Sequence, residues 1–212
     1  MRPVRAPGWW AAAVLAVTAV GTAVPARVKA DQARHLGVQL RALAGPSYAY
    51  AWQDLGPDGT STVEGFAVTG NVALGAMVGE ALALDMDLLL ARSPDASYGV
   101  QDSTTFTAVH FGLGVTYWLM PANVYLAGSI GPARTSVENA PVHFGFEVPT
   151  NDVSDVGIGA HLAIGKLWWL DRRWGLGASF SLALSTARNE LGEATSHRTL
   201  VAPTLALSTT FH

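Results

Sequence analysis

The segment Lys166–Leu184, KLWWLDRRWGLGASFSLAL, places three tryptophans around a charged turn and then alternates small residues with large apolar ones. Apolar side chains on one face of an extended segment and small ones on the other predict a β-strand. Tryptophan beside charged residues is typical of a boundary between lipid and water, because the indole ring is apolar while its N–H is polar. The segment therefore predicts two strands and a tight turn at a membrane surface.

The composition supports a membrane protein without membrane-spanning helices. The chain has 212 residues, no cysteine, and 14% charged residues, against roughly 25% in an ordinary soluble domain. After residue 30, no apolar run reaches the about 20 residues that a spanning helix needs. The length suits one domain. Strands are then the elements that would cross the membrane.

The first thirty residues have the pattern of a secretory signal peptide. Two arginines precede the apolar run Trp9–Val24, and small residues follow that suit cleavage after Ala26 or Ala30. We expect residues 1–30 to be removed during Sec-type export and residues 31–212 to form one barrel domain.

Charge excludes nucleic acid as a partner. Residues 1–30 contain four basic and no acidic residues, so the remaining chain carries 9 basic and 16 acidic residues. A mildly acidic exported protein without basic clusters is a poor nucleic-acid binder.

Period-two alternation recurs along the whole exported chain. It predicts eight strands, at about 35–50, 64–78, 80–92, 103–119, 123–136, 154–169, 173–188 and 197–211. Short turns at Gly79-Glu80, Pro121-Ala122 and Asp171-Arg172 alternate with longer polar links at about 51–63, 93–102, 137–153 and 189–196. Eight strands joined in this way predict an up-and-down antiparallel barrel with one short-turn rim and one long-loop rim.

The placement of charge decides which face of the barrel points outward. A water-soluble barrel needs a charged outer face, but long stretches lack charge, for example between Asp102 and Arg134 and between Arg173 and Arg188. On one face of these strands every second residue is Gly, Ala, Ser or Thr, and such small residues suit a narrow barrel interior. The large apolar residues on the other face suit contact with lipid. We therefore predict an all-β, eight-stranded antiparallel transmembrane β-barrel.

Aromatic residues near the predicted strand ends suggest two girdles at the membrane–water interfaces. The predicted interface aromatics are Tyr48, Tyr50, Trp52, Tyr117, Trp118, Tyr125, Trp168, Trp169, Trp174 and Phe211, with Phe66 and Phe106 near the long-loop rim.

The chain resembles the small outer-membrane β-barrel family of Gram-negative bacteria, the architecture of the OmpA transmembrane domain and OmpX. The resemblance rests on the repeats GLGV, GIGA and GLGA and on the last strand, LVAPTLALSTTFH, in which His212 follows the aromatic Phe211. It implies an outer-membrane location, contact with outer-membrane lipid and lipopolysaccharide, and recognition of the C-terminal strand by the barrel-assembly machinery.

Charged residues on the inward phase predict a polar cluster in the lumen. Arg41, Asp85 and Asp87 fall at similar depth, and we expect Arg41 to bridge the two aspartates, because an unpaired buried charge is costly. The predicted interior cluster also includes Asn71, His110 and His161. A structural plug is the favoured interpretation, and a gated ion path or proton-sensitive element is the alternative.

Residues with catalytic chemistry are present but poorly arranged. The candidates are Ser196-His197 with Glu190 or Glu193, and His143 with Glu147. Neighbouring residues on a strand point to opposite faces, so Ser196 and His197 cannot act together within one. Two interior histidines without a spaced carboxylate do not make a zinc site. We predict no catalytic site, metal or cofactor.

These observations predict a monomeric outer-membrane barrel that is not an enzyme and has a structural or surface-interaction role, with specificity in the loops. A lipid A-modifying enzyme and a narrow ion-conducting barrel remain the alternatives.

Overall fold

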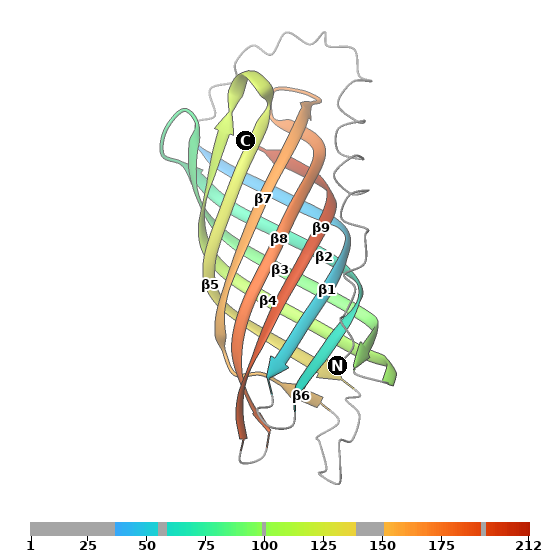
Figure 1. The fold of residues 1–212 in the computed structure, drawn as a ribbon. Helices are drawn as coiled ribbons and strands as arrows, with labels where there is room; N and C mark the ends of the chain where they lie inside the picture. Colours follow the sequence, from blue (N-terminus) through green and yellow to red (C-terminus); the bar gives the residue numbers. More distant parts are fainter. Residues whose placement is uncertain (1–36, 55–58, 99–100, 139–150, 192–193) are drawn as a thin grey trace. The chain divides into compact units, whose positions relative to one another are not determined.

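The computed structural model describes residues 37–54, 59–98, 101–138, 151–191 and 194–212 (Figure 1). All of them belong to one compact unit, Gln32–His212. The predicted signal peptide, residues 1–30, lies outside the described residues.

Eight long strands form a closed antiparallel ring. Each strand pairs with its neighbour in the sequence, and the β1–β9 and β4–β5 pairings complete the ring. The ring strands are β1 (Val38–Asp54), β2 (Thr60–Met77), β3 (Leu82–Tyr98), β4 (Gln101–Leu119), β5 (Val124–Glu138), β7 (Gly157–Trp169), β8 (Trp174–Leu191) and β9 (Ala194–Phe211). A short ninth strand, β6 (Asn151–Val153), pairs with the end of β5.

This ring confirms the predicted up-and-down barrel and its short-turn rim. Bends at residues 78–81 and 170–173 join β2 to β3 and β7 to β8, and the 3₁₀ turn η3 (Met120–Ala122) lies between β4 and β5. Asn123 follows η3 at a φ of 52°, a left-handed conformation that asparagine tolerates well. Among the described residues, no helix is long and apolar enough to cross a membrane.

The strands run further toward the long-loop rim than the sequence predicted. The expected link 51–63 contains strand residues up to Asp54 and from Thr60 onward, and in the expected link 93–102 the described residues, 93–98 and 101–102, are strand. In the expected link 189–196 the described residues, 189–191 and 194–196, are likewise strand. These strand ends mix polar and apolar residues, so the regular alternation that marks a strand is missing there although the backbone pairing continues.

Side chains alternate strictly between the two faces of the barrel wall. On β3, Leu84, Met86, Leu88 and Leu90 are about half exposed, whereas the residues between them are buried. The large apolar phase therefore faces outward, as predicted. We call its exposed members the apolar band: Val38, Leu40, Val72, Leu74, Leu82, Leu84, Met86, Leu88, Leu90, Val109, Phe111, Leu113, Val115, Leu119, Leu126, Ile130, Ile158, Leu162, Ile164, Leu176, Phe180, Leu205 and Leu207.

The strands are strongly staggered around the ring. Cα partners followed from Arg41 through successive strands lead back to β1 at Ala51, ten residues beyond the start. A stagger of this size in eight strands corresponds to a tilt of about 40° from the barrel axis. Figure 1 shows the resulting oblique course of the strands.

Candidate functional site: the barrel lumen

Two rows of residues across β1, β2 and β3 organise the polar part of the lumen. In the first row Arg41 pairs with Ala73, which pairs with Asp87; in the second, Gln39, Gly75 and Asp85 stand in the same relation. The middle residue of each row is small, so the long side chains on either side meet across it. A Cβ at Gly75 would collide with the Asp85 carboxylate.

Asp87 is the centre of the first row. Its carboxylate lies 3.8 Å from the Arg41 guanidinium and 3.3 Å from Nδ1 of His161, and it accepts a 2.9 Å hydrogen bond from the Asn71 side-chain amide. All four side chains are buried. The Arg41 guanidinium also lies 5.0 Å from the centre of the Tyr125 ring, which is a cation–π distance.

Asp85 belongs to a separate group. It accepts a 2.7 Å hydrogen bond from Gln39 Nε2 and another from the Thr116 hydroxyl, and Gln39 in turn accepts one from the Trp118 indole N–H at 3.1 Å. Arg41 therefore pairs with Asp87 and does not bridge the two aspartates, because the strand register places Asp85 opposite Gln39. The predicted single cluster is two adjacent groups.

His110 is buried in the lumen on β4, the strand that pairs with β3. Its Nε2 lies 3.1 Å from the Ser129 hydroxyl. The imidazole fits because its neighbours have no side chain: a Cβ at Gly112 would come within 2.6 Å of Nε2, and one at Gly159 within 2.8 Å of Nδ1. The inward glycines of β4 and β7 therefore accommodate this ring.

Many buried polar atoms in this middle layer have no protein hydrogen-bond partner among the described residues. They include Arg41 Nε and Nη1, Asn71 Oδ1, His110 Nδ1, Tyr125 Oη, His161 Nε2, Ser181 Oγ, Thr204 Oγ1 and Ser208 Oγ. Ordered water is the usual partner of such groups in protein interiors. The layer is therefore a polar compartment inside the barrel.

Aromatic side chains fill the lumen at the short-turn rim. The Trp118 ring lies 5.5 Å from Tyr125, 6.5 Å from Trp169 and 5.1 Å from the His212 ring, measured between ring centroids. Trp169 donates a 3.2 Å hydrogen bond from its indole N–H to the Asn123 side chain. These residues lie between the charged groups and the short-turn rim.

Three of the predicted interface aromatics are therefore interior residues. Trp118 and Tyr125 are 2% and 0% exposed, and Trp169 packs against them from the inward phase of β7. The expectation relied on closeness to a strand end and ignored the phase of the alternation. Phe106, also expected at an interface, is 1% exposed inside the barrel.

The other predicted interface aromatics face outward or lie partly exposed at the barrel surface. Tyr48, Tyr50, Tyr117 and Trp174 are exposed, and Trp52, Trp168 and Phe211 are half-buried. The Trp174 and Phe211 rings are 5.0 Å apart, and Tyr48 packs edge-on against Phe66 at 5.6 Å.

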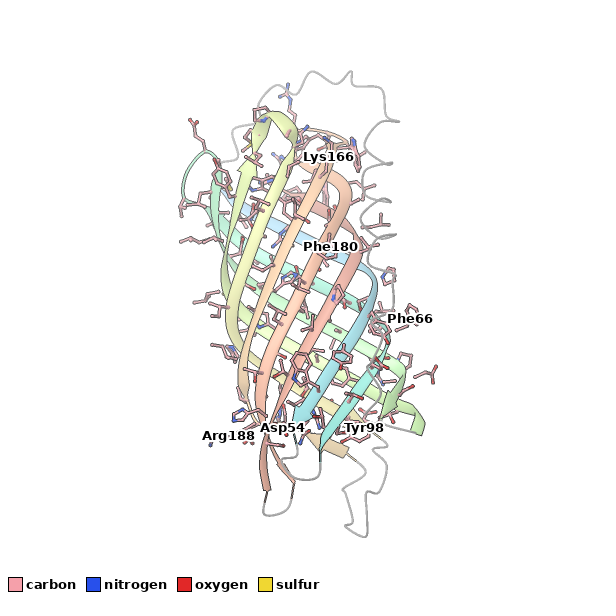
Figure 2. All side chains as sticks on the ribbon, viewed as in Figure 1. Asp54, Phe66, Tyr98, Lys166, Phe180 and Arg188 are labelled. Atoms are coloured by element: carbon pink, nitrogen blue, oxygen red, sulfur yellow. The ribbon has the colours of Figure 1, made fainter. Side chains whose placement is uncertain are left out.

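An apolar layer lies between the polar compartment and the long-loop rim. It consists of alanines around larger buried side chains, among them Leu89, Phe106, Val137 and Leu200. Beyond it, Arg198 donates a 3.0 Å hydrogen bond to Gln53 Oε1, and Gln53 donates one to the Ser196 hydroxyl. In Figure 2, Asp54, Tyr98 and Arg188 lie at this end of the barrel and Lys166 lies at the other.

This arrangement separates the predicted catalytic candidates. Ser196 is a buried strand residue held by Gln53, and not the exposed loop residue that we expected, while His197 is exposed on the opposite face of β9. His143, Glu147 and Glu193 lie outside the described residues, as does the side chain of Glu190. Within the described part of the chain, no three His, Asp or Glu side chains gather closely enough to hold a metal ion.

Sequence reasoning missed several lumen residues. Gln39, Thr116, Gln53 and Arg198 hold the interior hydrogen bonds at the two ends. All four are polar residues on the inward phase, which is the signal that identified Arg41 and Asp87. Gln53 and Arg198 were overlooked because they lie in or beside segments that were expected to be links.

The turn between β7 and β8 is organised by Asp171. Its carboxylate accepts hydrogen bonds from the backbone N–H groups of Arg173, at 2.6 Å, and Trp174, at 2.7 Å. These bonds, the one from Arg173 foremost, lower the pKa of Asp171 below its ordinary value, because they favour the charged carboxylate. The carboxylate of Asp171 therefore fixes the turn of the opening segment.

Comparison with known proteins identifies the fold. No protein-family model and no curated protein sequence matches the chain. Among solved structures, Neisserial surface protein A (NspA) is 16% identical, with a TM-score of 0.52 over 82% of this chain and 96% of that one. The outer membrane protein OprG from Pseudomonas aeruginosa is 12% identical (TM-score 0.45, 85% and 99% covered), and the outer membrane protein AlkL is 14% identical (0.49, 89% and 94%). The fold is that of the small outer-membrane β-barrels, as the sequence resemblance predicted.

Proposed function

We propose that this protein is a non-conducting outer-membrane barrel that anchors and presents a surface at its long-loop rim. The apolar band supports the membrane location. On β4 its outward positions run from Leu119 to Val109, ten residues apart, or about 25 Å along the barrel axis at this tilt. Membrane barrels have an outward apolar band about 25 Å tall.

The two clusters of buried apolar side chains inside the barrel are the single observation that carries the non-conducting role. The aromatic group of Trp118, Tyr125 and Trp169 closes it at one level, and the apolar layer around Phe106 and Leu200 closes it at another. An ion would have to cross both, and an apolar constriction is a strong barrier to an ion. In a gated ion path, both the aromatic group and the apolar layer would have to move.

The strand ends support a surface role. Beyond the apolar band, β1 continues to Asp54 and β9 begins at Ala194, and the pairing between these strands reaches Gln53 and Arg198. The buried hydrogen bonds of Gln53 stiffen this projecting part. It would form a platform clear of the membrane for contact with other molecules.

The enzymatic alternative has less support. Ser196 faces the lumen and His197 faces outward, so the pair cannot share a substrate. Under our proposal, Ser196→Ala and His197→Ala leave the lipid A composition of the cells unchanged, as judged by mass spectrometry. A change in acylation or headgroup that disappears with either variant would contradict the proposal.

The proposal includes export and assembly as a monomer. Residues 1–30 would direct Sec-type export and be removed, and the barrel-assembly machinery would recognise β9 with its outward Leu205, Leu207 and Phe211. Outer-membrane lipid and lipopolysaccharide would then surround the apolar band.

Electrophoresis of membrane fractions tests the location. An outer-membrane band that migrates differently before and after boiling is expected, because a closed barrel resists detergent until it is heated. A soluble periplasmic protein without this shift would overturn the proposal. Planar-bilayer recording of the purified barrel then tests the closed lumen: stable single-channel currents would contradict it.

A further inference from the structure

The apolar band is interrupted by a groove over β1 and β2. Leu207, Ala44, Gly70 and Leu90 occupy one paired row across β9, β1, β2 and β3, so an alanine and a glycine lie between two leucines. Ala42 extends the floor of the groove and Leu88 extends its wall. The groove has a volume of about 480 Å³, and its walls are exposed leucines.

A positive charge stands at the end of this groove nearer the long-loop rim. Arg92 follows Leu88 and Leu90 on the outward phase of β3, and it pairs with Val68 in the row next to Gly70 on that face. The row spacing of about 7 Å is within reach of an arginine side chain. Arg92 is exposed and makes no side-chain hydrogen bond or ion pair with any residue that the structure describes.

The level of Arg92 matches that of a lipid headgroup. Leu82 to Leu90 form the apolar phase of β3, and Arg92 is the first charged residue beyond them. At the same end, Tyr48 and Phe66 form an aromatic pair on β1 and β2. Aromatic rings and arginines with apolar stems are typical of the interface, where the stem lies along hydrocarbon and the head meets phosphate.

We infer that this groove binds one acyl chain of a phosphate-bearing membrane lipid, with Arg92 bound to the phosphate. The inference rests on the proposed membrane location. The groove supplies shape for the chain, since its small floor residues lie between higher leucine walls. Arg92 supplies the charge for a charge-assisted hydrogen bond with a phosphate oxygen. A second copy of the barrel would fill the groove with its own apolar side chains but would leave Arg92 without an anion.

Two substitutions separate the contributions of shape and charge. Gly70→Leu fills the groove, and a Cβ at Gly70 meets nothing within 4 Å, so the barrel tolerates it. Ala160→Leu is the matched control, because Ala160 is an outward small residue on β7, away from the groove. Arg92→Gln removes the charge alone, and Arg134→Gln on β5 is its control: Arg134 is also exposed, but its Nε is bound to the carbonyl of Ser154.

Native mass spectrometry of the barrel purified in mild detergent provides the test. With dioleoyl phosphatidic acid as the probe, we expect one retained lipid per barrel, and dioleoylglycerol, which has the same chains without phosphate, should bind on the order of tenfold more weakly. Gly70→Leu should weaken both lipids, whereas Arg92→Gln should weaken only phosphatidic acid. Both control variants should retain the wild-type amount.

The same spectra contain the outcomes that overturn the inference. Equal retention by wild type and Gly70→Leu would show that the groove holds no chain, and equal losses in Arg92→Gln and Arg134→Gln would show only general charge attraction. Displacement of the lipid by inorganic phosphate would reveal an anion site without a chain. A dimer that Gly70→Leu abolishes would make the occupant a second copy. None of these results bears on the proposed function, which is tested separately by the heat-modifiable band in electrophoresis.

Discussion

The Arg41 guanidinium and the Asp87 carboxylate face each other across Ala73, with Nη2 and Oδ2 3.8 Å apart and both side chains almost fully buried. The separation is long for an ion pair, and His161 and Asn71 complete the surroundings of the carboxylate. Charges held in this way are tolerated because each compensates the other, and removal of one leaves the other exposed to the full desolvation penalty.

Arg41→Met should therefore lower the free energy of unfolding by about 3–5 kcal/mol, because it leaves a buried carboxylate unpaired. The combination of Arg41→Met with Asp87→Asn should recover much of the loss. Arg41→Met with Asp85→Asn is the control and should recover little, since Asp85 has its own partners in Gln39 and Thr116. Urea titration of the barrel folded in lipid vesicles measures all four proteins. If Asp85→Asn recovers as much stability as Asp87→Asn, Arg41 does bridge the two aspartates.

Gly165 pairs with Tyr125, and its missing side chain leaves room for the phenol ring. Gly165→Ala should destabilise the barrel by about 1–3 kcal/mol, as overpacking does in a filled interior. Gly70→Ala, whose Cβ would meet nothing, should change little. A second change, Tyr125→Leu, should relieve the clash in Gly165→Ala. The same urea titration measures the free energy of unfolding of these variants. If Gly165→Ala leaves it unchanged, Tyr125 moves aside at little cost.

Asp171 makes the β7–β8 turn sensitive to acid. Because its folded-state pKa is lowered, its contribution to stability is present above the ordinary value of 3.8 and is lost as the pH falls through the lower, folded value. Asp171→Asn removes the charge but retains an acceptor oxygen. Wild type should therefore be the more stable protein at neutral pH, and the difference should vanish in strong acid. Urea midpoints of the two proteins across this range provide the measurement, and a constant difference would contradict it.

Trp118 closes only one of two levels in the lumen. Trp118→Ala should therefore leave the barrel without conductance in a planar bilayer, because the layer around Phe106 and Leu200 is unchanged. Trp118→Ala combined with Phe106→Ala should admit current more readily than either change alone. Conductance in the single Trp118→Ala variant would place the whole barrier at the short-turn rim.

The barrel could be predicted from its alternation because each strand has one large apolar phase and one small phase. Leu84, Met86 and Leu88 against Asp85 and Asp87 already indicate which face of β3 points inward. The ends of the strands could not be predicted, since Gln53 and Ser61 pair in a region where large apolar and small residues no longer alternate regularly. Backbone pairing continues there without the pattern that marks it.

The interior contacts depend on register, which the sequence does not contain. Depth counted along separate strands placed Arg41 level with both aspartates, but only the pairing through Ala73 and Gly75 shows which aspartate it faces. For Trp118, in contrast, the sequence did contain the information. Trp118 is an even-numbered residue of β4, like the inward residues His110 and Thr116, so an inward side chain was indicated, but its closeness to the strand end suggested an interface position instead.

The inward glycines constrain how the residues of the lumen can change during evolution. Gly165 exists beside the Tyr125 ring, Gly75 beside the Asp85 carboxylate, and Gly159 near His110, so each large group occupies the space of a neighbour's missing side chain. In each pair, the glycine can be replaced by a bulkier residue only after the large side chain beside it has been replaced by a smaller one. Divergence within the lumen should therefore proceed by paired replacements on facing strands, and an alignment of related barrels would show coupled columns there while the apolar band drifts freely.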